Sequence, residues 1–153
     1  MLRALACLAW LGGAAAAPPL QQEKETAAAV LRLTNAERAR AGVPLLEPNP
    51  NLARAAQLHA DAIARLRRLE HDLPGTPYPK LKDRLKAVGY EWDRAAENIS
   101  FGYTTAAAAV AGWMRSAGHR KNLLDKAYRE TGVGFSRDSA GKPYYVQVFA
   151  RPE

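Results

Sequence analysis

Cysteine is almost absent from this sequence, because Cys7 is the only one among 153 residues. Cys7 lies in an N-terminal apolar run that we expect to be removed on export, so the mature chain would contain none. That absence excludes disulfides, cysteine-ligated zinc and a thiol nucleophile, and the domain must be held by its core or by a bound ligand or metal. Most of the apolar run follows Cys7, which argues against a lipid anchor there.

Long apolar runs are missing as well. Residues 4–11 (ALACLAWL) form a short one, and no later segment approaches the roughly 20 residues that a membrane-spanning helix needs. Arg3 precedes this run, and Ala15-Ala16-Ala17 follow it before Pro18. This order predicts a signal peptide over residues 1–17 and an exported protein, secreted or periplasmic, with no transmembrane segment.

Two hydrolase motifs are also absent: the H-E-x-x-H of zinc proteases and the G-x-S-x-G of serine hydrolases. Basic residues outnumber acidic ones by 22 to 15, giving a formal charge of +7, which falls to +6 without Arg3. This excess favours weak attraction to envelope polymers or lipid head groups, or it is only a solvated basic surface. The basic residues are scattered without interleaved aromatics, so nucleic acid is not an expected partner.

Hydrophobic periodicity predicts helices at residues 21–41, 50–69 and 104–116, with a short amphipathic helix at 80–88. Asn49 or Asn51 can cap the second helix, and Pro50 suits its first position. A proline-rich loop at 71–79 and an extended segment at 96–102 follow. Residues 131–136 and 144–150 alternate as strands across a turn at 138–143. Helices first and a hairpin last predict an α+β fold.

Three histidines are the main candidates for chemistry. His59 lies on the apolar stripe of the second helix, which predicts a buried, satisfied side chain. His71 and His119 each follow a predicted helix end, in loops where side chains can reach solvent. With Glu97 and Glu130 also at element boundaries, the two loop histidines could form a metal or acid–base site, or both could be structural.

Ordered motifs run through nearly the whole mature chain, and their pattern resembles the CAP superfamily. That superfamily groups cysteine-rich secretory proteins, antigen 5 and plant pathogenesis-related proteins. The likeness covers residues 27–150, which we take as the domain after an N-terminal segment at 18–26, and it is greatest to the disulfide-free bacterial branch. The matching residues are Asn35, Arg38, Gly42, Leu45, Asn51-Leu52, Ala56, His59-Ala60, His71-Asp72, Asp83-Arg84, Gly89-Tyr90, Glu97-Asn98-Ile99, Gly102, Trp113-Met114, Ser116, Gly118-His119-Arg120, Asn122-Leu123-Leu124, Tyr128, Gly132-Val133-Gly134, Tyr144-Tyr145-Val146-Gln147 and Phe149.

The resemblance implies a three-layer α-β-α sandwich with a small, mainly antiparallel sheet. It also implies a cleft where two histidines and two acidic residues meet. His71 and His119 match the histidines, and Glu97 matches one acid. Asp83 is the nearest candidate for the other acid, and Glu130 has a family counterpart whose role could be to hold a loop.

Such a cleft suits a divalent cation, although no cofactor need be required. Two neutral imidazoles, from His71 and His119, would bind Zn²⁺ and leave positions for water. Glu97 could fix the tautomer of one histidine through its other ring nitrogen. The alternative is that Glu97 and Asn98 only tie loops together by hydrogen bonds.

Three functions fit these expectations. The domain could bind a lipid, sterol or other apolar or envelope ligand, in the cleft or in neighbouring grooves. It could be an extracellular hydrolase of protease type, using a histidine or metal-bound water with Glu97 as base. It could also be a structural envelope protein without catalysis. The missing nucleophile favours binding, by a monomer; hydrolysis that chelation stops and His119→Ala abolishes would favour the enzyme.

Overall fold

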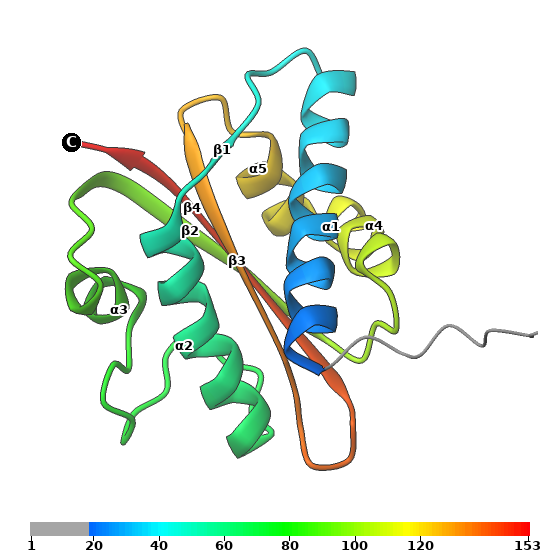
Figure 1. Cartoon of the computed structure of the whole chain (residues 1–153). Coiled ribbons are helices and arrows are strands. Elements are labelled where there is room, and N and C mark those ends of the chain that lie inside the picture. Colours follow the sequence, from blue (N-terminus) through cyan, green and yellow to red (C-terminus); the bar gives the residue numbers. More distant parts are fainter. Residues whose placement is uncertain (1–18) are drawn as a thin grey trace, which may run out of the picture.

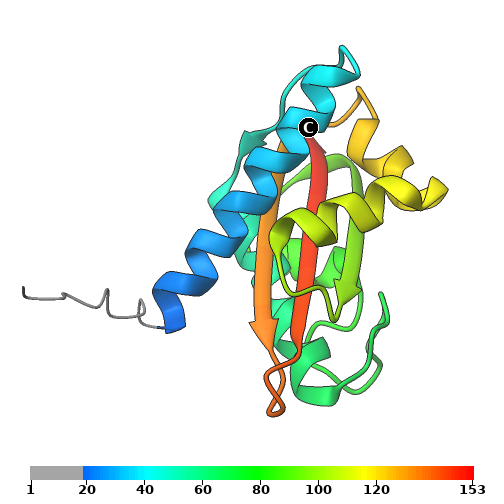
Figure 2. The same cartoon turned by 90° about the vertical axis from the view of Figure 1, so that its right-hand side faces the viewer.

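A computed structural model describes residues 19–153 and arranges them in three layers. The elements are α1 (Pro19–Arg40), β1 (Glu47–Pro48), α2 (Pro50–Leu66), α3 (Leu81–Ala87), β2 (Trp92–Phe101), α4 (Ala106–Arg115), α5 (Ala117–Leu124), β3 (Glu130–Arg137) and β4 (Pro143–Pro152). One sheet in the order β1-β3-β4-β2 lies between α2 and α3 on one face and α1, α4 and α5 on the other (Figures 1 and 2). The predicted α+β sandwich is confirmed. The predicted signal peptide, with Cys7, lies outside the described residues.

The second helix begins where its local sequence predicts. The Asn49 side chain accepts hydrogen bonds from the backbone N–H groups of Asn51 and Leu52, and Pro50 occupies the first turn. Arg67 ends the helix in a left-handed conformation, with φ of 53°, so α2 stops three residues before the predicted end. The buried face of α2 packs on the sheet, and its charged side chains lie on the opposite, exposed face.

The sheet extends further than the periodicity indicates. β3 and β4 form the predicted hairpin, and β2 pairs antiparallel with β4 over its length, so β2 begins at Trp92 rather than near residue 96. The segment between α1 and α2 contains the two-residue strand β1, which pairs parallel with β3. Further along β3, the Gln57 side-chain amide makes the hydrogen bonds that a neighbouring strand would make. It accepts a hydrogen bond from the backbone N–H of Phe135 and donates one to the carbonyl oxygen of Phe135.

Two glycines of β3 allow α2 to lie against the sheet. A Cβ added to Gly132 would stand 1.9 Å from the backbone nitrogen of Ala53, and one at Gly134 would stand 2.4 Å from the carbonyl carbon of Ala56. No side chain fits at these distances. The Gly-Val-Gly motif therefore sets the spacing between α2 and the sheet, while Val133 points to the opposite face.

One prediction about the C-terminal half is wrong. We expected a loop from Gly118 onward, but Ala117–Leu124 form helix α5, with Gly118 inside it and His119 on it. Ser116 is extended (φ −92°, ψ 121°) and is the only break between α4 and α5. Gly118 is not left-handed, so it does not end a helix. Within residues 19–153 no helix is both long and apolar enough to cross a membrane.

Candidate functional site

Glu97 is the centre of the polar cluster that the fold assembles on the edge strand β2. It is 7% exposed, and both of its carboxylate oxygens are engaged. Nδ1 of His71, from the loop after α2, donates to Oε1 over 3.0 Å. Nη2 of Arg84, from α3, donates to Oε2 over 2.7 Å. Three segments that are far apart in the sequence therefore meet at one carboxylate.

The charges of this cluster keep Glu97 ionised. Burial alone would raise the pKa of Glu97, but the hydrogen bond from His71 and the positive charge of Arg84 outweigh it and lower the pKa. The same hydrogen bond raises the pKa of His71 against the opposing effect of its partial burial. Because Nδ1 donates to the carboxylate, Nε2 is the nitrogen of His71 left for a ligand or proton. The His71 side chain is 56% exposed.

His59 is buried, as predicted, and lies against the same carboxylate. Its Nε2 is 3.0 Å from the carbonyl oxygen of Glu70, which can only accept, so this nitrogen carries the proton. It is also 3.6 Å from Oε1 of Glu97. Burial lowers the pKa of His59 to about 4, despite the nearby carboxylate. His59 is therefore neutral at pH 7 and anchors the residue that precedes His71.

His119 lies on α5, on the opposite face of the sheet from α2 and α3 (Figure 1). Asn98, next to Glu97 on β2, donates to the carbonyl oxygen of His119 over 3.0 Å and accepts from Asn122 over 3.0 Å. This pair fixes α5 to β2. Burial, and then the charge of His71, lower the pKa of His119. The two histidine rings are thus within electrostatic reach, although only His71 stands in a loop.

The two remaining acidic candidates are engaged elsewhere. Asp83 accepts the backbone N–H of Lys80 over 3.0 Å and so caps α3. Glu130, on β3, accepts from the Tyr90 hydroxyl over 2.6 Å and from the Asn49 side chain over 3.0 Å. Glu130 thereby joins β3, the start of α2 and the segment before β2, which is a holding role.

Arg84 is the cluster residue that sequence reasoning missed. It is 1% exposed and comes from the helix on which Asp83 was the expected contributor. The Asp83-Arg84 motif carries both a negative and a positive charge. The resemblance implies a second acidic residue in the cleft, so it favours Asp83. A signal was present: a buried glutamate in a strand needs a cation. Which residue supplies it depends on how α3 docks, and local sequence does not show that.

The donor set limits what metal the cluster can hold. Within residues 19–153, no group of three or more histidine, cysteine, aspartate or glutamate side chains is arranged to hold a metal ion. Both carboxylate oxygens of Glu97 already accept hydrogen bonds from His71 and Arg84. The described residues therefore do not fit a closed structural zinc site, which needs four protein ligands.

An apolar groove lies away from the histidines, between α1 and α2 beside β3. Its first part is a hollow of about 300 Å³, and a second of about 580 Å³ adjoins it and carries charged residues. The first is lined by Ala27, Ala28, Leu31, Pro48, Asn49, Pro50, Ala53, Thr131, Gly132 and Val133. The second shares Ala27, Ala53 and Val133 and adds Glu23, Lys24, Arg54, Gln57 and Asp61. We call the two together the α1–α2 groove.

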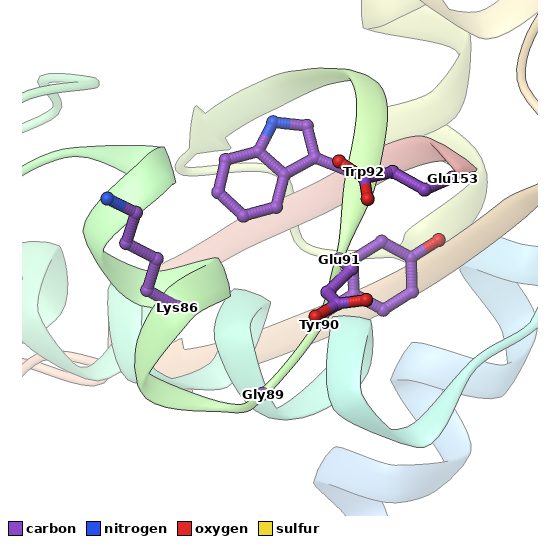
Figure 3. A pocket seen from close by; sticks show the side chains of 6 residues that line it. All are labelled: Lys86, Gly89, Tyr90, Glu91, Trp92 and Glu153. Atoms are coloured by element: carbon purple, nitrogen blue, oxygen red, sulfur yellow. The ribbon is translucent and has the colours of Figure 1, made fainter.

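Another hollow, of about 430 Å³, lies where β2 begins, and none of the cluster residues lines it. Its walls carry mixed charge around an indole, with Lys86 on one side of Trp92 and Glu153 on the other (Figure 3). The Tyr90 hydroxyl is already bonded to Glu130.

Comparison with known proteins agrees with this architecture. The model of the cysteine-rich secretory protein family, CAP, matches residues 31–149. The Bacillus subtilis membrane protein YlbC is 36% identical over 122 residues, covering 80% of this chain and 33% of YlbC. YkwD of the same organism is 34% identical over 108 residues, covering 69% of this chain and 40% of YkwD. A Bacillus anthracis extracellular protein with an SCP domain superposes with a TM-score of 0.80 at 31% identity, covering 90% of this chain and 45% of that one. The chain thus spans less than half of each of these proteins.

Proposed function

The chain belongs to the CAP family of cysteine-rich secretory proteins, and from this premise we propose that it acts outside the cytoplasm as a binding domain for a small apolar ligand. The observation that carries the proposal is the α1–α2 groove. Its first hollow has walls of alanine, leucine, proline and valine with few polar groups, and about 300 Å³ is at the lower end of small-molecule sites.

The groove favours an amphiphile with one alkyl chain. Its apolar part would hold the chain, and its second part carries Lys24 and Arg54 together with Glu23 and Asp61, which suits a polar head group. Because α1, α2 and β3 form its walls, the site is built on rigid elements rather than on loops.

Displacement of a fluorescent fatty acid tests the proposal. We expect cis-parinaric acid to bind and palmitate to displace it, and Ala27→Phe, which fills both hollows, to weaken binding about tenfold. Ala107→Phe, at an exposed position of α4, is the matched control and should bind like wild type. Equal binding by all three proteins, or none by wild type, would contradict the groove.

A second candidate function is divalent cation binding at His71 and His119, favoured by the outward Nε2 of His71. Two imidazoles predict micromolar affinity for Zn²⁺, weaker than sites with three or four ligands. Protonation of imidazole should weaken binding as pH falls through the histidine range near 6.5. Zn²⁺ should also raise the melting temperature.

Isothermal titration of wild type, His71→Ala, His119→Ala and His59→Ala distinguishes Zn²⁺ binding by His71 and His119 from binding that involves the buried His59. We expect loss of Zn²⁺ binding in the first two variants and retention in the third. Equal Zn²⁺ binding by all four proteins would contradict this cation site and leave the histidines with structural roles. Peptide hydrolysis that a chelator abolishes would replace simple binding by metal-assisted catalysis.

A further inference from the structure

The Arg84 guanidinium is buried with most of its hydrogen-bonding capacity unused. It carries five N–H groups, and the structure gives Nη2 one acceptor, Oε2 of Glu97. Nε and Nη1 are shielded from solvent and have no acceptor among residues 19–153. Leaving charged donors buried without acceptors is costly, because each loses its hydration without replacement. Arg84 therefore has donors that the described residues do not satisfy.

A hollow of about 240 Å³ lies beside this side chain, between α2 and the loop that precedes α3. Its apolar walls come from both segments, and Arg84 and His59 form part of its inner end. Its lining residues are Leu58, His59, Asp61, Ala62, Arg65, Thr76, Pro77, Tyr78 and Arg84. The α1–α2 groove lies along β3, whereas this hollow lies on the α3 side of α2 and shares only Asp61 with that groove.

We propose that this hollow binds a small monocarboxylate with a short apolar substituent, whose carboxylate accepts hydrogen bonds from the donors of Arg84 that lack an acceptor. Guanidinium and carboxylate match in charge and planar geometry. Leu58, Ala62 and Pro77 provide an apolar surface for the substituent. The proposal is independent of the apolar ligand and of the cation discussed above.

The surrounding charges select a single negative charge. Arg84 already balances Glu97 over 2.7 Å, and Arg65 lies at the exposed rim. Asp61 also lines the hollow, with its carboxylate held by the Gln57 amide over 2.8 Å. A dianion such as phosphate would meet repulsion from both Asp61 and Glu97, whereas a monocarboxylate meets less and gains the same donors.

Entry requires a small movement of the outer wall. Because Nε and Nη1 do not touch solvent, a carboxylate reaches them when the side chains of Pro77 and Tyr78 shift outward. Tyr78 is 42% exposed, so its ring can turn into solvent at little cost in buried area. The backbone at the ends of this loop stays joined by the Leu73–Pro79 hydrogen bond of 2.9 Å.

The Nε–H resonance of Arg84 in a ¹H–¹⁵N spectrum reports ligand contact directly. We expect 3-methylbutanoate to shift it saturably with millimolar affinity, and the neutral isostere 3-methylbutanamide to leave it unchanged. N-acetylalanine, added separately, distinguishes the carboxyl terminus of a peptide from a free acid; a shift with either acid supports the site. Equal shifts with acid and amide, or no shift with either acid, would overturn the proposal.

Substitutions locate the effect without removing the guanidinium. Ala62→Leu fills the hollow from α2 and should weaken 3-methylbutanoate binding about tenfold, while Ala107→Leu on α4 should not change it. Arg84→Met should abolish binding, but it leaves Glu97 buried without its cation, so its fold must be checked by circular dichroism. Wild-type affinity in Ala62→Leu would show that the acid binds elsewhere on the basic surface and would refute the site.

Discussion

Acidification should destabilise this protein through His59, and the size of the effect follows from the structure. The pKa of His59 is about 4 in the folded state, against 6.5 ordinarily. Between these pH values His59 binds a proton in the unfolded chain but not in the folded chain. The free energy of unfolding therefore decreases as pH falls. The stabilisation is complete above pH 6.5 and lost as pH falls toward 4. Its total is about 3 kcal/mol, of which about 2 kcal/mol is lost by pH 5.

Burial sets this sign, because it is the largest cause of the lowered pKa of His59. The charges of Arg84 and His71 lower the pKa further, whereas the charge of Glu97 and the hydrogen bond to the Glu70 carbonyl oppose them. His71 acts in the other direction: because its folded-state pKa is raised, its contribution is present below pH 6.5 and is lost as pH rises through the raised value. The interval from pH 6.5 to 5 therefore isolates the histidines with lowered pKa, His59 and His119.

Urea unfolding of wild type and His59→Gln at several pH values measures the effect. The glutamine amide can still donate to the Glu70 carbonyl, so the variant should keep the local structure at pH 7. Its unfolding free energy should fall by about 2 kcal/mol less than that of wild type between pH 6.5 and 5. His119→Gln controls for the second histidine. Parallel pH profiles for wild type and His59→Gln would refute the reasoning.

Four other substitutions follow from the packing and the cluster. Gly132→Ala should cost about 3 kcal/mol, at the upper end of overpacking effects, because the added Cβ would stand 1.9 Å from the backbone nitrogen of Ala53. Gly118→Ala lies inside α5 with no atom within 4 Å of the added Cβ and should stabilise the fold by about 0.5–1 kcal/mol. Thermal melts would show both effects, and a tolerated Gly132→Ala would mean that α2 is not held by the sheet. Glu97→Gln removes the charge that raises the pKa of His71, so the pKa should fall on titration followed by NMR; an unchanged pKa would contradict the hydrogen bond. Trp113→Ala should cost about 3–5 kcal/mol, since Trp113 is 1% exposed and donates to a buried carbonyl; an unchanged melting temperature would contradict its core position.

Local signals in the sequence were sufficient for most of the fold. The Asn49 cap, the Pro50 start and the alternation of the terminal hairpin each depend on neighbours in sequence, and the structure confirms them. β1 could not be predicted this way, because two residues become a strand only by pairing with β3. α5 was not predicted because Gly118 is an ordinary stop signal, whereas tertiary contacts such as the Asn98–His119 hydrogen bond hold the chain helical beyond it.

Most residues of the candidate site could be named from the sequence, but their arrangement could not. His71, Glu97 and His119 were found by motif, and the structure brings Glu97 and His71 into direct contact. Arg84 was not found, because its role depends on the docking of α3 against β2, a long-range property. The helix periodicity that placed α3 correctly carries no information about which charge it presents to a strand.

The position of Arg84 also decides which group in the cluster can act as a base. A general base needs an accessible acceptor with a pKa near the working pH. Glu97 has neither, since both oxygens accept hydrogen bonds in a buried site and its pKa is lowered. Nε2 of His71 has both, because the side chain is exposed and its pKa is raised from 6.5. We therefore expect any acid–base chemistry of this cluster to involve His71, with Arg84 and Glu97 as the pair that orients it.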